Sequence, residues 1–172
     1  AAMGFFSRLM GGSDEQKTAA SELEILAPVS GELVHLENTN DPAFSSRAVG
    51  DGVAVVPQEG TVCAPVSGTV AALFPTEHAL GIMSDDSSAQ VMLHIGIDTV
   101  KLEGKGFHAL VAQGDHVDVG QPLVEVDFDA VRAAGFDPTV FVILCERSEN
   151  STLREHASGP VAVKEPVVWL SE

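Results

Sequence analysis

Two histidines, His78 and His94, stand in apolar surroundings where a polar side chain is unusual. His94 lies within the strand-like apolar run of residues 91–97, and His78 comes just before a second apolar stretch that begins at Ala79. Burial lowers the pKa of an imidazole, so such a ring tends to be neutral and nucleophilic at pH 7. From this pattern alone the rings are either core histidines with satisfied hydrogen bonds, the commoner case, or groups available for chemistry.

The spacing of the two histidines predicts that they meet. Residues 79–84 and 90–95 are typical of strands, and the polar residues 85–89 between them suit a hairpin loop. Folding this hairpin places His78 opposite His94. Two converging imidazoles suit proton relay, phosphoryl transfer or metal binding. A structural zinc site would need two further ligands, and the two cysteines are distant in sequence and lack Cys-x-x-Cys spacing, so metal binding is the weaker interpretation.

The elements that must position these histidines are predicted to be strands. From about residue 22 onward, short runs rich in Val and Ile are interrupted by Gly, Pro, Asp and Ser. The expected strands are residues 24–27, 31–35, 53–57, 61–64, 68–73, 79–84, 90–95, 108–112, 116–117, 122–127, 139–145, 159–163 and 167–170. Helix is limited to residues 127–134 and one turn beginning at Asp41-Pro42. We therefore expect an all-β fold, an antiparallel β-sandwich or barrel-sandwich hybrid.

An internal repeat points to pseudo-symmetry within this fold. Residues 27–31 and residues 64–68 both read Ala-Pro-Val-Ser-Gly, and each copy runs into an apolar strand. Proline followed by glycine predicts two equivalent corners. Residues 113–123 form a further corner signature that resembles the turn of biotinyl and lipoyl carrier domains. The modified lysine of those carriers is missing, so this likeness supports the architecture and not the carrier chemistry.

Composition excludes some classes of function. The chain has 172 residues with 25 acidic and 9 basic side chains, a formal charge of −16, which argues against binding nucleic acid or an anionic membrane surface. We expect residues 22–172 to form one domain and residues 1–21 to be a flexible tail. Its apolar residues 3–10 could contact a membrane weakly as an amphipathic segment. No signal-peptide pattern is present, which predicts a cytoplasmic location.

Five motifs give the chain a specific family resemblance. They are residues 50–54 (Gly-Asp-Gly-Val-Ala), 64–69 (Ala-Pro-Val-Ser-Gly-Thr), 76–79 (Thr-Glu-His-Ala), 94–100 (His-Ile-Gly-Ile-Asp-Thr-Val) and 104–107 (Gly-Lys-Gly-Phe). In this order they resemble the glucose-type IIA component of the bacterial sugar phosphotransferase system, from about residue 22 to the end of the sequence. The segment containing the two histidines is the most specific part of the match.

The resemblance implies a phosphotransferase function and a role for each site residue. His94 would be phosphorylated by the histidine phosphocarrier protein, and His78 would stabilise the phosphoryl group. Thr76 would orient His78, and Asp98 would belong to the polar surroundings, although the residues alone equally suit a turn aspartate that closes the strand. The phosphoryl group would pass to a cysteine on the IIB domain of a glucose or N-acetylglucosamine permease. No cofactor is required, and a zinc ion at His78 and His94 is the one metal site suggested.

The resemblance also implies an apolar partner-binding surface around the histidines. By motif position its members are Phe44, Ala48, Val49, Phe74, Leu80 and Met92. The alternative interpretation is that half of them are simply core residues. Transporters or kinases regulated by this protein are further expected partners, and neither they nor the sugar can be named from the sequence.

Two other functions compete with phosphoryl transfer. One is a regulatory binding module that does not transfer phosphate, against which the His78 and His94 pair argues. The other is a metal-dependent hydrolase built on the same histidines, which lacks a carboxylate-rich ligand set of the usual spacing.

Overall fold

Antiparallel strands make up most of the regular structure in the computed structural model, which describes residues 22–172. The strands are β1 (Leu23–Leu26), β2 (Gly31–His35), β3 (Asp51–Pro57), β4 (Thr61–Cys63), β5 (Gly68–Leu73), β6 (Ala79–Ser84), β7 (Ala89–Ile95), β8 (Phe107–Ala109), β9 (His116–Val117), β10 (Pro122–Val126), β11 (Val140–Arg147), β12 (Thr152–Glu155), β13 (Gly159–Val161) and β14 (Pro166–Ser171). The predicted all-β antiparallel class is confirmed. The predicted tail, residues 1–21, lies outside the described residues.

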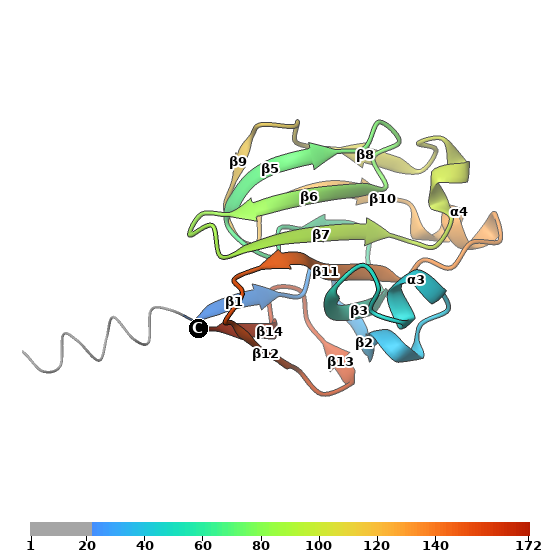
Figure 1. The fold of residues 1–172 in the computed structure, drawn as a ribbon. Helices are drawn as coiled ribbons and strands as arrows, with labels where there is room; N and C mark the ends of the chain where they lie inside the picture. Colours follow the sequence, from blue (N-terminus) through green and yellow to red (C-terminus); the bar gives the residue numbers. More distant parts are fainter. Residues whose placement is uncertain (1–21) are drawn as a thin grey trace, which may run out of the picture.

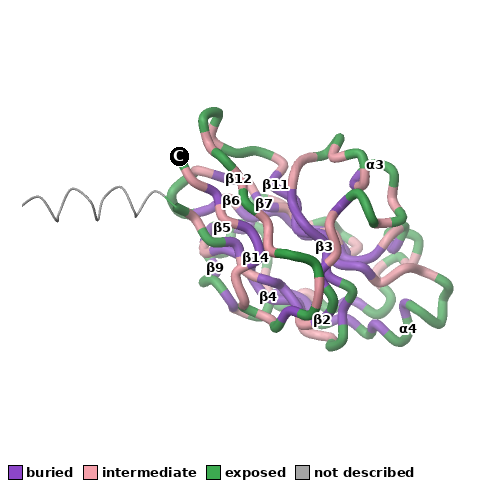
Figure 2. The backbone as a smooth tube through the Cα atoms, turned by 90° about the horizontal axis from the view of Figure 1, so that it is seen from below, coloured by how far each residue is buried: buried purple, intermediate pink, exposed green. Residues whose placement is uncertain are grey.

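The strands form one large sheet and two small ones (Figure 1). The large sheet has eight strands in the order β13-β2-β3-β11-β7-β6-β5-β9, and the three-stranded sheets are β1-β14-β12 and β4-β10-β8. Side chains from all three sheets pack into a common apolar core, and Figure 2 shows that the buried stretches run along the strands while the loops are exposed. This arrangement agrees with the expected sandwich.

Strand alternation places His94 away from this main core. Along β7 the residues alternate between buried and partly exposed, and Val91, Leu93 and Ile95 face the core. His94 and Met92 therefore face the other side of the sheet. On that side lies a second, smaller apolar cluster of Leu36, Phe44, Ala54, Phe141 and Ile143. A histidine inside an apolar strand is thus explained by its position on the outer face.

The internal repeat is visible as reciprocal hydrogen bonding. The N–H of Leu26, just before the first copy, donates to the carbonyl of Pro65 in the second copy at 2.9 Å. The equivalent N–H of Cys63 donates to the carbonyl of Pro28 in the first copy at 2.8 Å. The two copies therefore contact each other as a local two-fold pair, and the predicted pseudo-symmetry is confirmed.

The corner predicted at residues 113–123 has a counterpart that its sequence did not reveal. The N–H of Val119 donates to Ser67 Oγ at 2.8 Å, and the N–H of Val163 donates to Ser30 Oγ at the same distance. The two serines are equivalent positions of the repeat. Each repeat copy is therefore held by its own corner.

The helices are short. They are the 3₁₀-helices η1 (Leu36–Asn38) and η2 (Thr99–Leu102) and the α-helices α3 (Pro42–Ser45) and α4 (Phe128–Ala133). Both α-helices were predicted, and each begins with an aspartate N-cap: Asp41 accepts from the N–H of Ala43 at 2.9 Å and Asp127 from the N–H of Ala130 at 3.0 Å. None of the helices within residues 22–172 has the length and apolar character that a membrane crossing requires.

Two strand predictions differ from the structure. β12 was not predicted, because Thr-Leu-Arg-Glu carries three polar side chains on a strand at the edge of its sheet. The strand expected at residues 108–112 ends at Ala109. The chain then turns, and the N–H of Gly114 pairs with Val70 of β5 instead.

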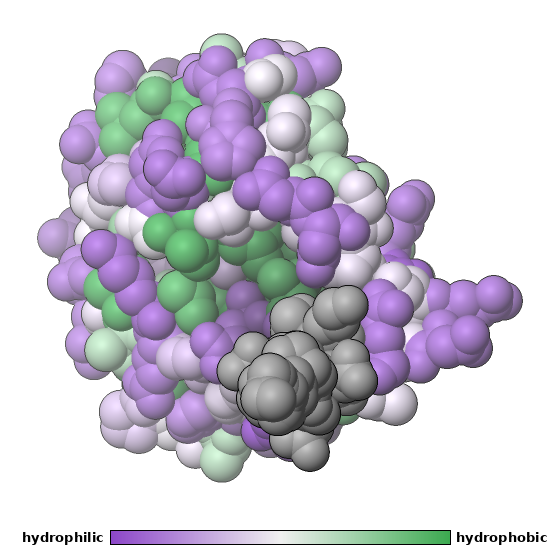
Figure 3. All heavy atoms as spheres, turned by 90° about the vertical axis from the view of Figure 1, so that its left-hand side faces the viewer, coloured by the Kyte–Doolittle hydropathy of each residue, from purple (hydrophilic) through white to green (hydrophobic). Residues whose placement is uncertain are grey.

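An apolar depression lies at the end of the molecule that faces the viewer in Figure 3, where apolar atoms gather in the middle and hydrophilic residues surround them. Its volume is about 300 Å³. The residues lining it are Leu23, Glu24, Leu26, Val66, Ser67, Asp85, Asp86 and Val119. The β6–β7 loop supplies Asp85 and Asp86, and His78 stands at the opposite end of β6, roughly 20 Å away along the strand. This depression is therefore separate from the two histidines.

Candidate functional site

His78 and His94 lie next to each other at one end of the β6–β7 hairpin. Ala79 pairs with His94 across the two strands, and the N–H of Ile95 donates to the carbonyl of His78 at 2.7 Å. The centroids of the imidazole rings are 5.1 Å apart, with the ring planes at 84°. The predicted convergence of the two histidines is confirmed.

Two phenylalanine side chains lie beside the half-buried ring of His94. Its centroid lies 5.2 Å from that of Phe44 on α3 and 6.3 Å from that of Phe141 on β11. The two phenylalanine rings stack on each other at 4.3 Å. This aromatic wall limits the access of water to one side of the imidazole.

A backbone hydrogen bond decides which nitrogen of His94 is free. Nδ1 lies 2.8 Å from the carbonyl oxygen of Gly96. A carbonyl can only accept a hydrogen bond, so Nδ1 carries the proton and the lone pair of the neutral ring is on Nε2. Gly96 has a φ of +83°, and a Cβ at this position would lie 2.4 Å from Cγ2 of Thr99. The bend that brings the carbonyl to His94 therefore requires glycine.

Opposing influences act on the protonation of His94. Burial lowers the pKa of His94, while the hydrogen bond to Gly96 and the negative charges of Asp41 and Asp98 act to raise it; the net shift is downward. Asp98 is exposed, has a φ of +62° and is the N-cap residue that precedes η2. The assignment of Asp98 to the polar surroundings of His94, which the family resemblance implies, stays a prediction.

His78 is almost completely buried, with 3% of its surface exposed. Its Nδ1 lies 2.6 Å from Oγ1 of Thr76, so the predicted contact between these residues is present. When the threonine hydroxyl donates to Nδ1, the proton of the neutral ring is on Nε2 and available to a ligand. Burial, together with the neighbouring His94, lowers the pKa of His78 to about 4, so the ring is neutral at pH 7.

The lowered pKa of His78 predicts a pH-dependent stability. The unfolded chain binds this proton below the ordinary value of 6.5, whereas the folded chain binds it only near 4. Between these values the unfolded state holds more protons, so the free energy of unfolding falls as pH falls, by a total on the order of 3 kcal/mol. Urea unfolding between pH 7 and 4 should show this slope, and it should be shallower in His78→Gln. A pKa of His78 near 6.5 in an NMR titration would contradict it.

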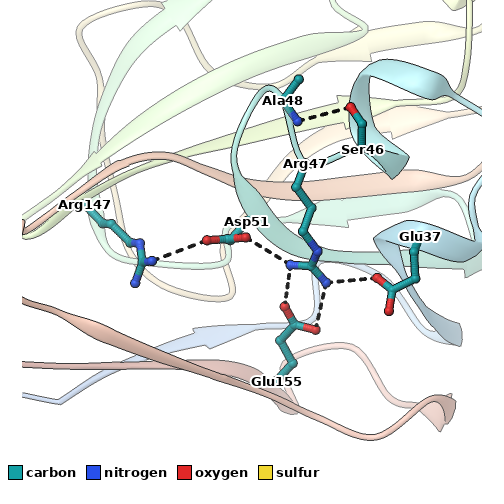
Figure 4. A network of polar contacts seen from close by, with 7 residues as sticks. All are labelled: Glu37, Ser46, Arg47, Ala48, Asp51, Arg147 and Glu155. Atoms are coloured by element: carbon teal, nitrogen blue, oxygen red, sulfur yellow. Dashed lines mark hydrogen bonds and ion pairs between the residues drawn. The ribbon is translucent and has the colours of Figure 1, made fainter.

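The α3 segment that carries Phe44 is fixed on both sides. Before the helix, Nδ2 of Asn40 donates to Oδ2 of Asp137 at 3.0 Å. After it, the guanidinium of Arg47 contacts three carboxylates (Figure 4). They belong to Glu37 at 3.1 Å, Asp51 at 3.1 Å and Glu155 at 2.9 Å. The hydrogen bond to Glu155 is the largest cause of a raised pKa of Arg47. These contacts connect α3 to η1, β3 and β12.

Removal of Arg47 should loosen this segment. Arg47→Ala leaves three neighbouring carboxylates without their shared cation, and we expect a loss of about 2 kcal/mol in the free energy of unfolding. Arg147→Ala is the matched control, because Arg147 contacts Asp51 at 3.3 Å but does not hold α3; it should cost less than about 1 kcal/mol. Urea unfolding measures both, and equal losses in the two variants would contradict the role of Arg47.

The predicted partner-binding residues fall into two groups. Phe74 is 47% exposed and Val49 is 36% exposed, Ala48 is exposed and Met92 is half-buried. The prediction is wrong for Leu80, which is fully buried, because it pairs with Leu93 and shares the core-facing side of that residue. It is also wrong for Phe44, which is 5% exposed because its ring covers His94 and Phe141.

Three residues of the site were not predicted from the sequence. Phe141 belongs to a continuous apolar strand whose inner and outer faces look alike. Gly96 belongs to the motif of residues 94–100, but it contacts His94 through its backbone carbonyl, and the residue type does not indicate such a contact. Arg47 meets Glu155 across 108 residues of sequence, so nothing local to either residue indicates the contact.

Metal binding is limited by the number of ligands. Within residues 22–172 no group of three or more His, Cys, Asp or Glu side chains is placed to hold a metal ion. His78 and His94 offer two ring nitrogens, half of a tetrahedral zinc set. A zinc ion would therefore need ligands from another molecule, and this site stays a prediction.

Comparisons with known proteins identify relatives over most of the chain. Residues 23–150 match the family described as phosphoenolpyruvate-dependent sugar phosphotransferase system, EIIA 1. The chain is 41% identical over 144 residues to the PTS system glucose-specific EIICBA component of Streptococcus pneumoniae, covering 84% of this chain and 20% of that protein. It is 39% identical over 170 residues to the beta-glucoside-specific EIIBCA component of Bacillus subtilis, covering 98% of this chain and 28% of that protein.

A further sequence relative and a solved structure also match the chain. The N-acetylglucosamine-specific EIICBA component of Klebsiella pneumoniae is 42% identical over 137 residues, covering 80% of this chain and 21% of that protein. A solved structure, glucose permease IIA from Mycoplasma capricolum, superposes with a TM-score of 0.79 at 34% identity, covering 86% of this chain and 95% of that one. The chain thus spans between 20% and 28% of the length of these three curated relatives and nearly all of the solved IIA structure.

Proposed function

The chain belongs to the EIIA 1 family of the phosphoenolpyruvate-dependent sugar phosphotransferase system, and on this premise we propose that it is a phosphohistidine carrier. His94 accepts a phosphoryl group from the histidine phosphocarrier protein. It then passes the group to a cysteine on the IIB domain of a sugar permease. The family supports a phosphocarrier role in general terms, and the residues named below are our assignment.

The hydrogen bond from His94 Nδ1 to the Gly96 carbonyl is the observation that carries this proposal. It leaves Nε2 as the nucleophile. The Nε2 lone pair forms a bond to phosphorus, the P–N bond of the donor phosphohistidine breaks, and its electron pair remains on the donor nitrogen. The onward step to the IIB domain follows the same pattern. A cysteine thiolate forms an S–P bond, the Nε2–P bond breaks, and its electron pair remains on Nε2 of His94. No redox change or cofactor is needed.

His78 and Thr76 supply the stabilisation that such a transfer needs. Because the pKa of His78 is lowered to about 4, its ring is a neutral donor and not a cation at pH 7. With the Thr76 hydroxyl donating to Nδ1, the Nε2–H of His78 can donate to a phosphoryl oxygen on His94. A fixed neutral donor stabilises the transferring group without trapping it as a tight ion pair. Positioning of this kind is the main source of catalysis in phosphoryl transfer.

The exposed apolar residues beside the histidines suit the docking of partner proteins. Phe74 lies edge-on to His78 with 5.5 Å between ring centroids, and nearly half of its surface is exposed. Relatives are named as glucose-specific, beta-glucoside-specific and N-acetylglucosamine-specific EIICBA or EIIBCA components of the PTS system. We propose a IIB domain of such a permease as acceptor, and a cytoplasmic location for the reaction. Regulatory binding to transporters or kinases stays a prediction.

Reconstitution of the relay tests the proposal. The chain is incubated with phosphoenolpyruvate labelled in its phosphate, the general phosphotransferase enzyme and the histidine phosphocarrier protein. We expect label on the chain that is acid-labile and alkali-stable, the behaviour of a phosphohistidine. Omission of the phosphocarrier protein should abolish the labelling. A chain that stays unlabelled in the complete mixture while binding the phosphocarrier would instead be a regulatory module without transfer.

A further inference from the structure

Glu77 stands between Thr76 and His78 and has a backbone conformation that is unusual for glutamate. Its φ is +64°, in the left-handed region that glycine, asparagine and aspartate occupy more readily. Its N–H donates to the carbonyl of Phe74 at 2.8 Å and so closes the turn that joins β5 to β6. The conformation of residue 77 therefore decides the direction in which the chain continues into His78.

The side chain of Glu77 is held by a different sheet. Its Oε1 accepts a hydrogen bond from the backbone N–H of Ala109 at 2.7 Å. Ala109 belongs to β8, an edge strand of the three-stranded sheet β4-β10-β8, and lies 32 residues further along the chain. The carboxylate thus satisfies a backbone donor of β8 and fastens the β5–β6 turn, which belongs to the eight-stranded sheet, to the smaller sheet.

The placement of the two site residues depends on this turn. Thr76 and His78 are the direct neighbours of Glu77, and the 2.6 Å contact from Thr76 Oγ1 to His78 Nδ1 spans it. A right-handed or extended conformation at residue 77 would redirect His78 relative to Thr76. It would also change the 5.1 Å approach of the two imidazole rings.

We propose that Glu77 is a positioning residue of the site. By tying the turn to β8, its carboxylate maintains the left-handed conformation that sets His78 between Thr76 and His94. Glu77 acts through His78, because its hydrogen bond is made to β8 and not to either imidazole. The importance of this placement for transfer rests on the proposed function, whereas the placement itself can be measured without it.

Three substitutions separate the tether from the backbone effect. Glu77→Gln keeps an acceptor oxygen at the same reach, Glu77→Ala removes the tether, and Glu77→Gly removes the tether while making the left-handed conformation easy. For each variant we would measure the rate of phosphoryl transfer from His94 to the IIB domain. The ¹⁵N shifts and pKa of His78 would be measured in the unphosphorylated protein. Thermal unfolding identifies any variant that fails to fold.

We expect Glu77→Gln to transfer within about twofold of the original chain and to keep the His78 signals. Glu77→Ala should be slower by about tenfold, since small displacements of reacting groups reduce rates strongly, and the pKa of His78 should move upward toward 6.5. Glu77→Gly should be slowed less, by about threefold, because glycine adopts the left-handed conformation without the tether. Rates at the original level in the alanine or glycine variant would overturn the proposal, as would a glutamine variant as slow as alanine. If the original chain accepts no phosphate at all, the proposed function fails, and the His78 signals still decide the role of Glu77.

Discussion

His94→Ala should abolish acceptance of the phosphoryl group from the histidine phosphocarrier protein. The substitution removes Nε2, the nitrogen that the Gly96 hydrogen bond leaves unprotonated. The other ring of the pair cannot substitute, because with the Thr76 hydroxyl donating to Nδ1 of His78 and the proton on Nε2, neither nitrogen of His78 has a free lone pair. We expect the label incorporated in the relay assay to fall to background, a loss of at least about 10³-fold.

A folded but inactive variant is needed for this comparison. His94 is half-buried between aromatic rings, so alanine creates a small cavity beside Phe44 and Phe141. His94→Gln fills more of this space and lacks a nucleophilic ring nitrogen, and it should be equally inactive. His116→Ala is the matched control: His116 lies on β9, is exposed and pairs with Asp85, and its removal should leave labelling unchanged. Label that survives in both His94 variants would refute the assignment.

His78→Gln should accept phosphate on His94 and pass it on slowly. Glutamine retains an N–H donor but loses the imidazole geometry fixed by Thr76 and the edge contact with Phe74. We expect acceptance within about tenfold of the original rate and onward transfer to the IIB cysteine slowed by about 10²-fold. This is the usual cost of losing one preorganised donor to a transferring group. Rapid-quench measurement of each half-reaction separates the two rates.

The comparison of labelling in the His78 and His94 variants decides which histidine is phosphorylated. If His78→Gln cannot be labelled at all while His94→Gln can, the roles of the two histidines are reversed. Thr76→Val is the matched second variant, since it removes the hydroxyl at nearly constant volume and leaves both rings in place. Thr76→Val should slow onward transfer to the IIB cysteine less than His78→Gln does. It should not slow the phosphorylation of His94 by the phosphocarrier protein further. A Thr76→Val chain that behaves like the original would show that the 2.6 Å contact with His78 does not orient the ring for transfer.

Local sequence patterns were sufficient to predict the hairpin that joins the two histidines. Two short apolar runs and the loop of residues 85–89 between them predicted β6, β7 and the meeting of His78 with His94, which lie only 16 residues apart. The repeated Ala-Pro-Val-Ser-Gly segment predicted the pseudo-symmetric corners, because each copy is a short local motif that can be recognised without knowledge of the fold. The contact of Thr76 with His78 is also local, and it was expected from the family resemblance.

Features that depend on distant segments were not predictable in this way. The family motif places Leu80 on the partner surface, but Leu80 is buried in a strand whose two faces look alike in sequence. The contacts of Arg47 with Glu155 and of Glu77 with Ala109 join segments 108 and 32 residues apart. Such pairings arise from how the sheets pack, so only the folded chain reveals that Phe44 and the turn before His78 are held from outside the site.

The identity of the phosphorylated atom tests the central claim most directly. The complete relay is used to phosphorylate the chain labelled with ¹⁵N in its histidines, and the ³¹P–¹⁵N coupling and imidazole shifts are recorded by NMR at alkaline pH, where the P–N bond persists. Our account predicts one phosphorylated residue, His94, with phosphorus bonded to Nε2 and the proton retained on Nδ1 against the Gly96 carbonyl. Phosphorus on Nδ1 of His94, or on any other histidine of the chain, would contradict it.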